Sequence, residues 1–342
     1  MEPVAALQRV AYLLEAKNEP TFKVKAFRRA ASVIADLDPQ RLTALAGAGR
    51  LEDLPGIGKT TAQLINEAVA GGTPAYLAHL EEERPPRPGG EIGRLFEALL
   101  GDCHSHSDWS DGGSPIAEMA AAARDRGLAY LVLTDHSPRL TIAHGLSPER
   151  LVEQLEIVAE VNETMSPFRL LSGIEVDILE DGSLDQDPEL LGALDLVVAS
   201  VHSKLRMESR PMTARMLAAV ESPHTDVLGH CTGRLIVGRG RPPSAFDAES
   251  IFAACARTGT AVEINSRPDR RDPPRELLER ALDAGCLFAI DSDAHAPGQL
   301  EWPINGCEQA VEAGVPAERV VNTWPVDRLL AWTSDHGAGV TG

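Results

Sequence analysis

Seven short runs of aliphatic and β-branched residues, separated by stretches with helical periodicity, constrain the fold of this chain most strongly. In order, the runs are 99–101, 130–136, 169–178, 195–202, 226–230, 260–265 and 287–295. Strands that alternate with helices indicate a parallel sheet, because each helix returns the chain to the same end of the sheet. The runs lack a glycine-rich dinucleotide-binding turn, and we therefore predict a closed α/β barrel of seven units rather than an open sheet.

The segment before these runs predicts a separate all-helical domain. Apolar residues recur at helical spacing through residues 4–14 and again through residues 27–34. The sequence EEERPPRPGG follows, and its charge run, prolines and glycines predict an exposed linker. We place the helical domain at 1–83, the linker at 84–98 and the barrel at 99–342.

The formal net charge of −19 is unevenly distributed along the chain. Residues 1–88 contain 11 Lys and Arg against 11 Asp and Glu, so the rest of the chain carries the whole excess. Within the neutral segment, FKVKAFRR concentrates four cations, which form either a solvated helix face or a contact with nucleic acid. The chain has no apolar run long enough to span a membrane, and its five cysteines are scattered. We expect a cytoplasmic protein with reduced thiols.

Metal-capable side chains lie at the ends of six of the seven runs. The first run leads into GDCHSHSDWSDGG, where His104 and His106 alternate and so face one side of an extended strand. The same stretch contains Asp111 after the turn, and the later runs contribute Asp135, His136, Glu175, Asp177, His202, His230, Asp291, Asp293 and His295. Because a parallel barrel gathers the carboxyl ends of its strands at one rim, we expect these residues to meet there.

Imidazoles mixed with carboxylates, with no cysteine at the matching points, suit Zn, Mn or Fe. So many ligands exceed the needs of one ion, and two or three divalent metal ions that share a bridging carboxylate would account for them. Closely spaced metals favour phosphoester hydrolysis, because they stabilise the attacking and leaving oxygens and acidify a water. Arg234, Lys204 and Arg267 follow directly after barrel strands and are candidates to hold phosphate oxygens.

The motifs DCHSHSDWSDG, LTDHS, GIEVDI, ASVHS, LGHCTGR, EIN and DSDAH resemble, in order and spacing, those of the PHP (polymerase and histidinol phosphatase) domain. The resemblance implies a distorted, seven-unit TIM-like barrel with a trinuclear metal centre. It implies one metal at His104, His106, Glu175 and Asp293, a second at Glu175, His202 and His230, and a third at Asp111, His136 and His295. We expect catalysis to depend most on Glu175, His202 and Asp293.

The stretch MTARMLAAVESPHTDVLGHCTGRLIVGR resembles the PHP domain of bacterial family X DNA polymerases, and LEDLPGIGKTTAQLINEAV resembles the helix–hairpin–helix of their amino-terminal lyase-type domain. This resemblance implies DNA contact through Lys23 and Lys25 and through the hairpin at Gly56 and Gly58, whose backbone can approach a phosphate. Alternatively, the hairpin only packs helices. Lyase-active relatives use a lysine where this chain has Leu64, and the linker leaves no room for a polymerase palm.

Three functions follow from these observations. The first is a multi-metal phosphoesterase that acts on DNA, as a 3′–5′ exonuclease or 3′-end processing enzyme in DNA repair, without polymerase activity. The second is a small-molecule phosphatase of the histidinol-phosphatase type, and the third is a non-catalytic, metal-stabilised DNA-binding protein. The complete ligand set counts against the third, and the helix–hairpin–helix counts against the second. We therefore expect a metal-dependent phosphoric ester hydrolase with DNA as its partner.

Overall fold

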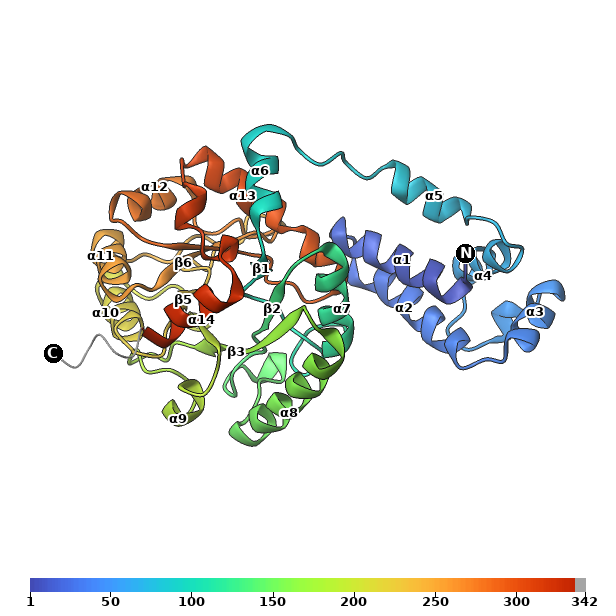
Figure 1. The fold of residues 1–342 in the computed structure, drawn as a ribbon, viewed down its shortest axis with the longest axis horizontal. Helices are drawn as coiled ribbons and strands as arrows, with labels where there is room; N and C mark the ends of the chain where they lie inside the picture. Colours follow the sequence, from blue (N-terminus) through green and yellow to red (C-terminus); the bar gives the residue numbers. More distant parts are fainter. Residues whose placement is uncertain (336–342) are drawn as a thin grey trace. The chain divides into compact units, whose positions relative to one another are not determined.

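The computed structural model describes residues 1–335. The chain divides into two compact units, Met1–Arg87 and a second unit that begins at Pro88 (Figure 1). The end of the predicted 99–342 domain, from residue 336 onward and including His336, lies outside the described residues. Within residues 1–335, no helix is both long enough and apolar enough to cross a membrane.

The first unit is all-helical, as the sequence predicts. Its helices are α1 (Pro3–Ala16), α2 (Thr21–Ala35), α3 (Pro39–Gly47), α4 (Lys59–Val69) and α5 (Ala75–Glu82), with a 3-10 turn, η1 (Leu51–Asp53), before α4. Leu7, Val10 and Leu14 share one face of α1 and are buried, and α1 packs against α2. Helix α3 begins where the Asp38 carboxylate accepts hydrogen bonds from the backbone amides of the first turn.

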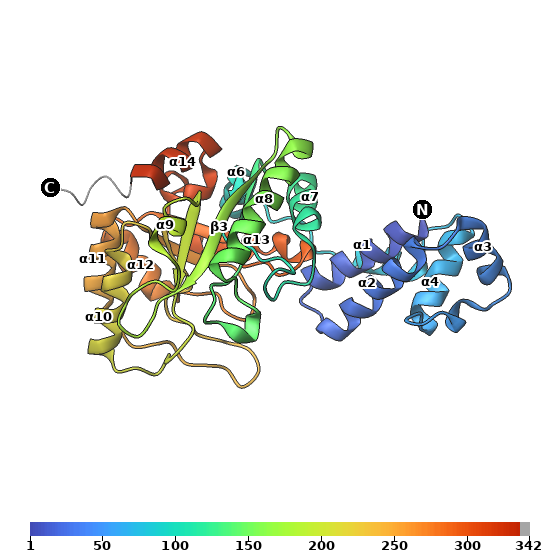
Figure 2. The same cartoon turned by 90° about the horizontal axis from the view of Figure 1, so that it is seen from below.

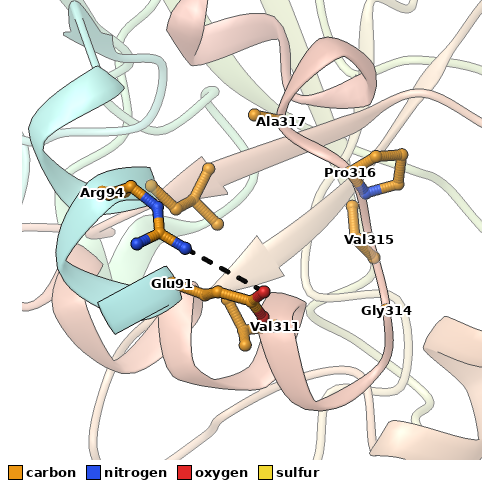
Figure 3. Close-up of a pocket in the computed structure, with 8 residues that line it drawn as sticks. Glu91, Arg94, Val311, Gly314, Val315, Pro316 and Ala317 are labelled. Carbon is orange, nitrogen blue, oxygen red and sulfur yellow. Dashed lines mark ion pairs between the residues drawn. The ribbon is translucent and has the colours of Figure 1, made fainter. Parts of the chain in front are cut away.

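The segment predicted as a linker, 84–98, contains a helix in its second half. Helix α6 (Gly90–Ala98) packs against α13 (Pro303–Glu312), and Leu95 and Phe96 join the barrel's outer core. The apolar residues of α6 recur at helical spacing, but the proline-rich stretch before them favoured the prediction of a linker. A groove of about 340 Å³ lies between α6 and residues 314–317 (Figure 3).

The second unit is a barrel of seven parallel strands in sequential order. The strands are β1 (Gly101–Asp102), β2 (Tyr130–Leu133), β3 (Arg169–Asp177), β4 (Leu196–Ser200), β5 (Val227–Leu228), β6 (Ala261–Asn265) and β7 (Phe288–Asp291). Just beyond the ends of β1 and β7, Ser105 pairs with Ala294 in a parallel bridge, which nearly closes the barrel. The predicted seven-unit barrel is confirmed.

Helices surround the strands. They are α7 (Ile116–Arg126), α8 (Pro148–Met165), α9 (Pro188–Leu191), α10 (Ser209–Val220), α11 (Ala248–Thr258), α12 (Arg275–Asp283), α13 and α14 (Val326–Asp335), with 3-10 turns at η2 (Thr141–Ala143), η3 (Pro297–Glu301), η4 (Ala317–Arg319) and η5 (Val321–Thr323). Figure 2 shows α10, α11 and α12 on one side of β3 and α7 and α8 on the other. Each helix after a strand starts near the carboxyl end of that strand, so the loops before the helices form one rim.

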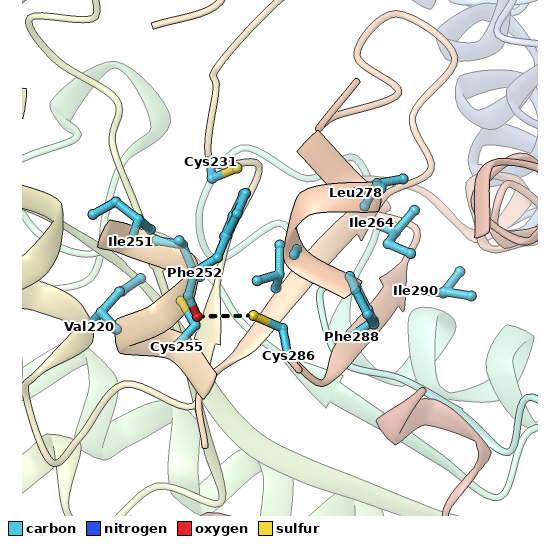
Figure 4. Close-up of a cluster of buried hydrophobic side chains, with 14 of the residues drawn as sticks. Val220, Cys231, Ile251, Phe252, Cys255, Ile264, Leu278, Cys286, Phe288 and Ile290 are labelled. Carbon is cyan, nitrogen blue, oxygen red and sulfur yellow. Dashed lines mark hydrogen bonds between the residues drawn. The ribbon is translucent and has the colours of Figure 1, made fainter. Parts of the chain in front are cut away.

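The barrel interior is apolar at the amino ends of the strands. Tyr130, Val132, Leu171 and Val198 are fully or almost fully buried there, in a cluster that includes Trp324 and its neighbours from the end of the chain. A larger core lies between strands and helices, where Phe252 of α11 and Phe288 of β7 belong to one cluster that also includes buried cysteines (Figure 4). Polar residues that point into the barrel are therefore concentrated at the carboxyl ends of the strands.

Candidate metal centre

Glu175 lies between two pairs of histidines at the carboxyl-end rim. Its Oε1 atom is 2.8 Å from Nε2 of His230 and 3.2 Å from Nε2 of His202. Its Oε2 atom is 2.9 Å from Nδ1 of His136 and 3.3 Å from Nε2 of His104. These four histidines follow four different strands, and the side chain of Glu175 is 1% exposed. A carboxylate whose two oxygens face separate imidazole pairs has the geometry of a bridging ligand.

Two further carboxylates extend this arrangement. Oδ1 of Asp293 is 3.4 Å from Nε2 of His106 and 3.5 Å from Nδ1 of His295. Oδ1 of Asp111 is 3.4 Å from Nε2 of His136 and 3.3 Å from Nε2 of His295. All nine residues expected as ligands from the sequence are therefore gathered at this rim.

The donor atoms form overlapping groups. The described residues contain three sets whose donors all lie within 4.8 Å of one another: His106, Asp111, His136 and His295; His104, His106 and Glu175; and His136, Glu175 and His202. The sets resemble the three implied by family resemblance, but they leave out Asp293 and His230, and His106 and His136 each belong to two of them. The two rings lie between neighbouring groups and link them, with centroids 4.5 Å apart.

The residues present fit divalent metal ions. Buried ring nitrogens of His104, His106, His136 and His230 have no hydrogen-bond partner in the described structure. A buried polar atom without a partner is costly, whereas coordination to a metal would satisfy it. The donors are imidazole nitrogens and carboxylate oxygens, which suits Zn, Mn or Fe.

The electrostatics of the site favour cations. Burial, together with His295 and His136, lowers the pKa of His106 to about 3, so this ring is neutral and able to coordinate. Burial also disfavours the charged form of His136, but Glu175 and Asp111 outweigh it and raise its pKa to about 10. The pKa of Glu175 stays well below its usual range despite burial, because of the surrounding histidines. Metal ions would therefore compete with protons for the site.

Two buried carboxylates contact expected ligand histidines at the ring nitrogen that does not face Glu175. Oε1 of Glu263 lies 2.6 Å from Nδ1 of His104, and Oδ1 of Asp177 is hydrogen-bonded to Nδ1 of His202. Each contact leaves the Nε2 atom of its histidine directed toward Glu175. Such carboxylate–histidine pairs fix the orientation of metal ligands. The sequence analysis grouped Asp177 with the metal-capable residues and gave Glu263 no role beyond the EIN motif.

Two other metal-capable carboxylates are occupied by structural hydrogen bonds. Asp135 accepts hydrogen bonds from Ser107 and from Nε2 of Gln154, and so fastens the loop after β1. Asp291 accepts one from the backbone amide of Cys103 and one from Nδ2 of Asn322. Both carboxylates are fully or almost fully buried, and they belong to the framework beneath the centre.

A cavity of about 300 Å³ opens over the centre. Its lining comprises Asp111, His136, Leu140, Ile142, Ala143, Glu175, His202, His230, Arg267, Arg270, Asp293 and His295. Leu140, Ile142 and Ala143 give it an apolar side, and Arg267 and Arg270 give it a cationic side. The sequence analysis missed Arg270, although it follows β6 three residues after Arg267. Both guanidinium groups lie near Asp293, at 3.6 Å for Arg267 and 3.5 Å for Arg270.

Two expected phosphate-binding residues have other positions. Neither Arg234 nor Lys204 is among the residues that line the cavity. Arg234 donates hydrogen bonds to the backbone carbonyls of Arg270 and Arg271, because the loop after β6 folds back against it. Lys204 is exposed, with its ammonium nitrogen 4.0 Å from Glu180. Arg234 thus holds the loop that carries Arg270.

In the first unit, the hairpin between η1 and α4 contains Gly56 and Gly58. Gly56 has φ of +99°, and a Cβ there would lie 2.5 Å from Nε of Arg29. Gly58 precedes the first turn of α4, and the space beside it is open. Lys23 forms an ion pair with Glu19 at 2.6 Å, whereas Lys25 is exposed. Leu64 is buried within the helical core.

Comparison with known families matches both units. Residues 1–74 match the helix-hairpin-helix domain, and residues 102–267 match the PHP domain. With the barrel and its imidazole–carboxylate rim, these matches define a PHP-domain, metal-dependent phosphoesterase that carries a helix-hairpin-helix domain at its amino terminus. The predicted class of enzyme is confirmed.

The relatives include one protein named as an exonuclease and several named as probable phosphatases. The chain is 38% identical over 224 residues to "DNA polymerase/3'-5' exonuclease PolX" of Bacillus subtilis, and the match covers 66% of this chain but 39% of that protein. It is 28% identical over 240 residues to a "Probable phosphatase" of Thermoanaerobacter sp., covering 66% of this chain and 91% of that protein. A solved structure of histidinol phosphate phosphatase from Lactococcus lactis, complexed with Zn, L-histidinol and phosphate, matches with TM-score 0.45 and 18% identity, over 64% of this chain and 95% of that one.

Proposed function

We propose that this phosphoesterase acts on DNA as a 3′–5′ exonuclease or 3′-end processing enzyme in repair, without polymerase activity. The observation that carries the proposal is the presence of a helix-hairpin-helix domain and a PHP domain in one chain. The similarity to a relative named as a 3'-5' exonuclease falls in the PHP region and supports it. The proposed domain limits are 1–83 and 99–342, and the stretch between them is too short for a polymerase domain.

The nine rim residues are proposed to hold two or three divalent metal ions. When bound, such ions supply Lewis acidity, which polarises a phosphoester and makes a water more acidic. Glu175 provides a shared negative charge between the histidine pairs, while Glu263 and Asp177 keep two of the rings in orientation. Arg267 and Arg270 line the cavity above and are placed to neutralise phosphate oxygens as charge develops.

The amino-terminal unit is proposed to hold DNA. Gly58, beside which the space is open, allows the backbone to approach a phosphate, whereas a Cβ at Gly56 would meet the Arg29 side chain. The exposed Lys25 adds positive charge to the same domain. Lys23 contributes less, because Glu19 already pairs with it.

A small-molecule phosphatase of the histidinol-phosphatase type is the second candidate. The relatives named as probable phosphatases match over 90% or more of their own length, and the match covers about two thirds of this chain. The cavity of about 300 Å³ is also large enough for a small phosphate monoester. This function would leave the helix-hairpin-helix domain without a role in catalysis.

One experiment separates the two candidates. The full chain is incubated with Mn²⁺ and either a 5′-labelled single-stranded oligonucleotide or L-histidinol phosphate. A ladder of products shortened from the 3′ end supports the nuclease. Phosphate release from L-histidinol phosphate with an intact oligonucleotide contradicts it and favours the phosphatase.

A further inference from the structure

Charge is divided sharply around the carboxyl-end rim of the barrel. The loops after β4, β5 and β6, at 201–208, 229–247 and 266–274, contain eight Lys and Arg against four Asp and Glu. The loops after the other four strands, at 103–115, 134–147, 178–187 and 292–296, contain one cation against eight acidic residues. Residues 89–342 together carry the chain's whole net charge of −19, so these three loops are basic although their domain is acidic. We call these three loops the basic arc.

Hydrogen bonds join the basic arc into one surface. The Ser244 hydroxyl in the loop after β5 donates to the Leu205 carbonyl in the loop after β4, at 2.8 Å. The Ile236 amide in the loop after β5 donates to the Asp269 carbonyl in the loop after β6, also at 2.8 Å. The three loops are therefore connected to one another through the loop after β5.

The cations of the basic arc differ in their surroundings. Arg267 and Arg270 line the cavity over the metal centre, and Arg234 is bound to backbone carbonyls. Arg206 and Arg239 are exposed and form no ion pair or hydrogen bond with any side chain or backbone group of residues 1–335. Positive charge thus runs from the cavity onto open surface, where two guanidinium groups are free to bind a ligand.

The same arc exposes apolar side chains. Ile236 and Val237 are 52% and 59% exposed and precede Arg239 by three and two residues. Within residues 1–335 they are two of only six large apolar side chains that are exposed. Another of the six, Ile142, lines the cavity. A single nucleic-acid strand offers both phosphates for the cations and unpaired bases for the apolar side chains. A duplex keeps the faces of its bases stacked inside and exposes only their edges, in the grooves.

We propose that the basic arc binds a single nucleic-acid strand next to the phosphodiester that is cleaved, so that the barrel itself holds the strand. This inference rests on the proposed nuclease function and deepens it. Phosphates bind along Arg206 and Arg239, bases contact Ile236 and Val237, and the end of the strand enters the cavity beside Arg267 and Arg270.

The test compares two substrates in the full chain with Mn²⁺. The ratio of kcat/KM for a twelve-residue oligothymidylate to kcat/KM for p-nitrophenyl phosphate is measured in wild type and in R206A/R239A. We expect the ratio to fall about tenfold, through a higher KM for the oligonucleotide. The slope of log(kcat/KM) for the oligonucleotide against log salt concentration should become shallower by about 0.7 for each phosphate that an arginine no longer neutralises. The control R257A/R280A removes the same charge from the far ends of α11 and α12 and should leave the ratio unchanged.

A second variant tests the apolar contact. I236S/V237S should lower the same ratio without changing the salt dependence, because an apolar contact releases no counterions. The inference is overturned if the active wild type and R206A/R239A have equal ratios, or if R257A/R280A lowers the ratio as much. If the wild type hydrolyses p-nitrophenyl phosphate but leaves the oligonucleotide intact, the proposed nuclease function fails, and the role of the basic arc fails with it.

Discussion

A single buried carboxylate, Glu175, faces four imidazoles, and its charge decides whether cations can sit close together. Glu175→Gln keeps the volume of the side chain but removes this charge. We expect kcat/KM on p-nitrophenyl phosphate to fall at least about 100-fold, because metal-dependent activation of water is lost, while the fold is retained. The control Glu189→Gln changes an exposed residue and should have no effect. Unchanged turnover in Glu175→Gln would show that the metals do not use this residue.

Glu263 acts one step away from the metals, through the His104 ring. In Glu263→Gln a neutral amide replaces the carboxylate that lies 2.6 Å from Nδ1 of His104. The ring then loses its fixed orientation and part of its basicity, and we expect affinity for Mn²⁺ to fall about 10- to 100-fold. Competition with a chromophoric chelator measures this affinity directly. Equal affinities of the variant and the wild type would mean that the contact does not tune the ligand.

Proton competition makes metal binding depend on pH. The pKa of His136 is about 10 in the metal-free site, so at neutral pH this ring carries a proton that a metal ion must displace. The affinity for Mn²⁺ should therefore rise as pH increases from 6 to 9, and binding should release protons. Calorimetry in two buffers of different ionisation enthalpy measures that release. An affinity that stays constant across this pH range would contradict the expectation.

At the scale of elements, the sequence predicts the strands well because each is a buried run, and six of the seven runs end in a metal-capable residue. Alternation alone places His104 and His106 on one side, and both lie in the centre. The sequence does not predict which arginines face the cavity. Arg234 and Arg270 both follow strands, and only the path of the folded loops directs Arg270 inward and Arg234 toward backbone carbonyls. The paths of such loops depend on tertiary contacts, which a local sequence pattern does not predict.

Helix α6 provides a test at this scale, because the sequence analysis assigned its residues to a linker. Phe96 is 7% exposed, belongs to the barrel's outer core and lies under the Arg126 guanidinium group. Phe96→Ala should lower the free energy of unfolding by about 3 to 5 kcal/mol, as for other buried aromatic residues. Urea denaturation measures the loss, and the exposed Glu97→Ala is the control. A midpoint equal to that of the wild type would restore the interpretation of this segment as a linker.

Over the whole molecule, positive charge available to DNA occurs in two separate places. One is the neutral amino-terminal unit with Lys25 and its hairpin, and the other is the basic arc of an otherwise acidic barrel. A strand too short to contact both units depends only on the second place, whereas a strand that binds both units depends on each. The length of the substrate therefore distinguishes the contributions of the two units.

Substrate length therefore tests whether the amino-terminal unit binds the strand. For a thirty-residue oligothymidylate, Lys25→Glu should raise KM several-fold, and its effect should multiply with that of R206A/R239A, because independent contacts made by separate units add in free energy. For a four-residue strand, Lys25→Glu should have no effect, while R206A/R239A should still raise KM. Steady-state kinetics of the three variants on both lengths measures these changes. If Lys25→Glu raises KM equally for both lengths, or for neither, the amino-terminal unit does not bind the additional part of the longer strand.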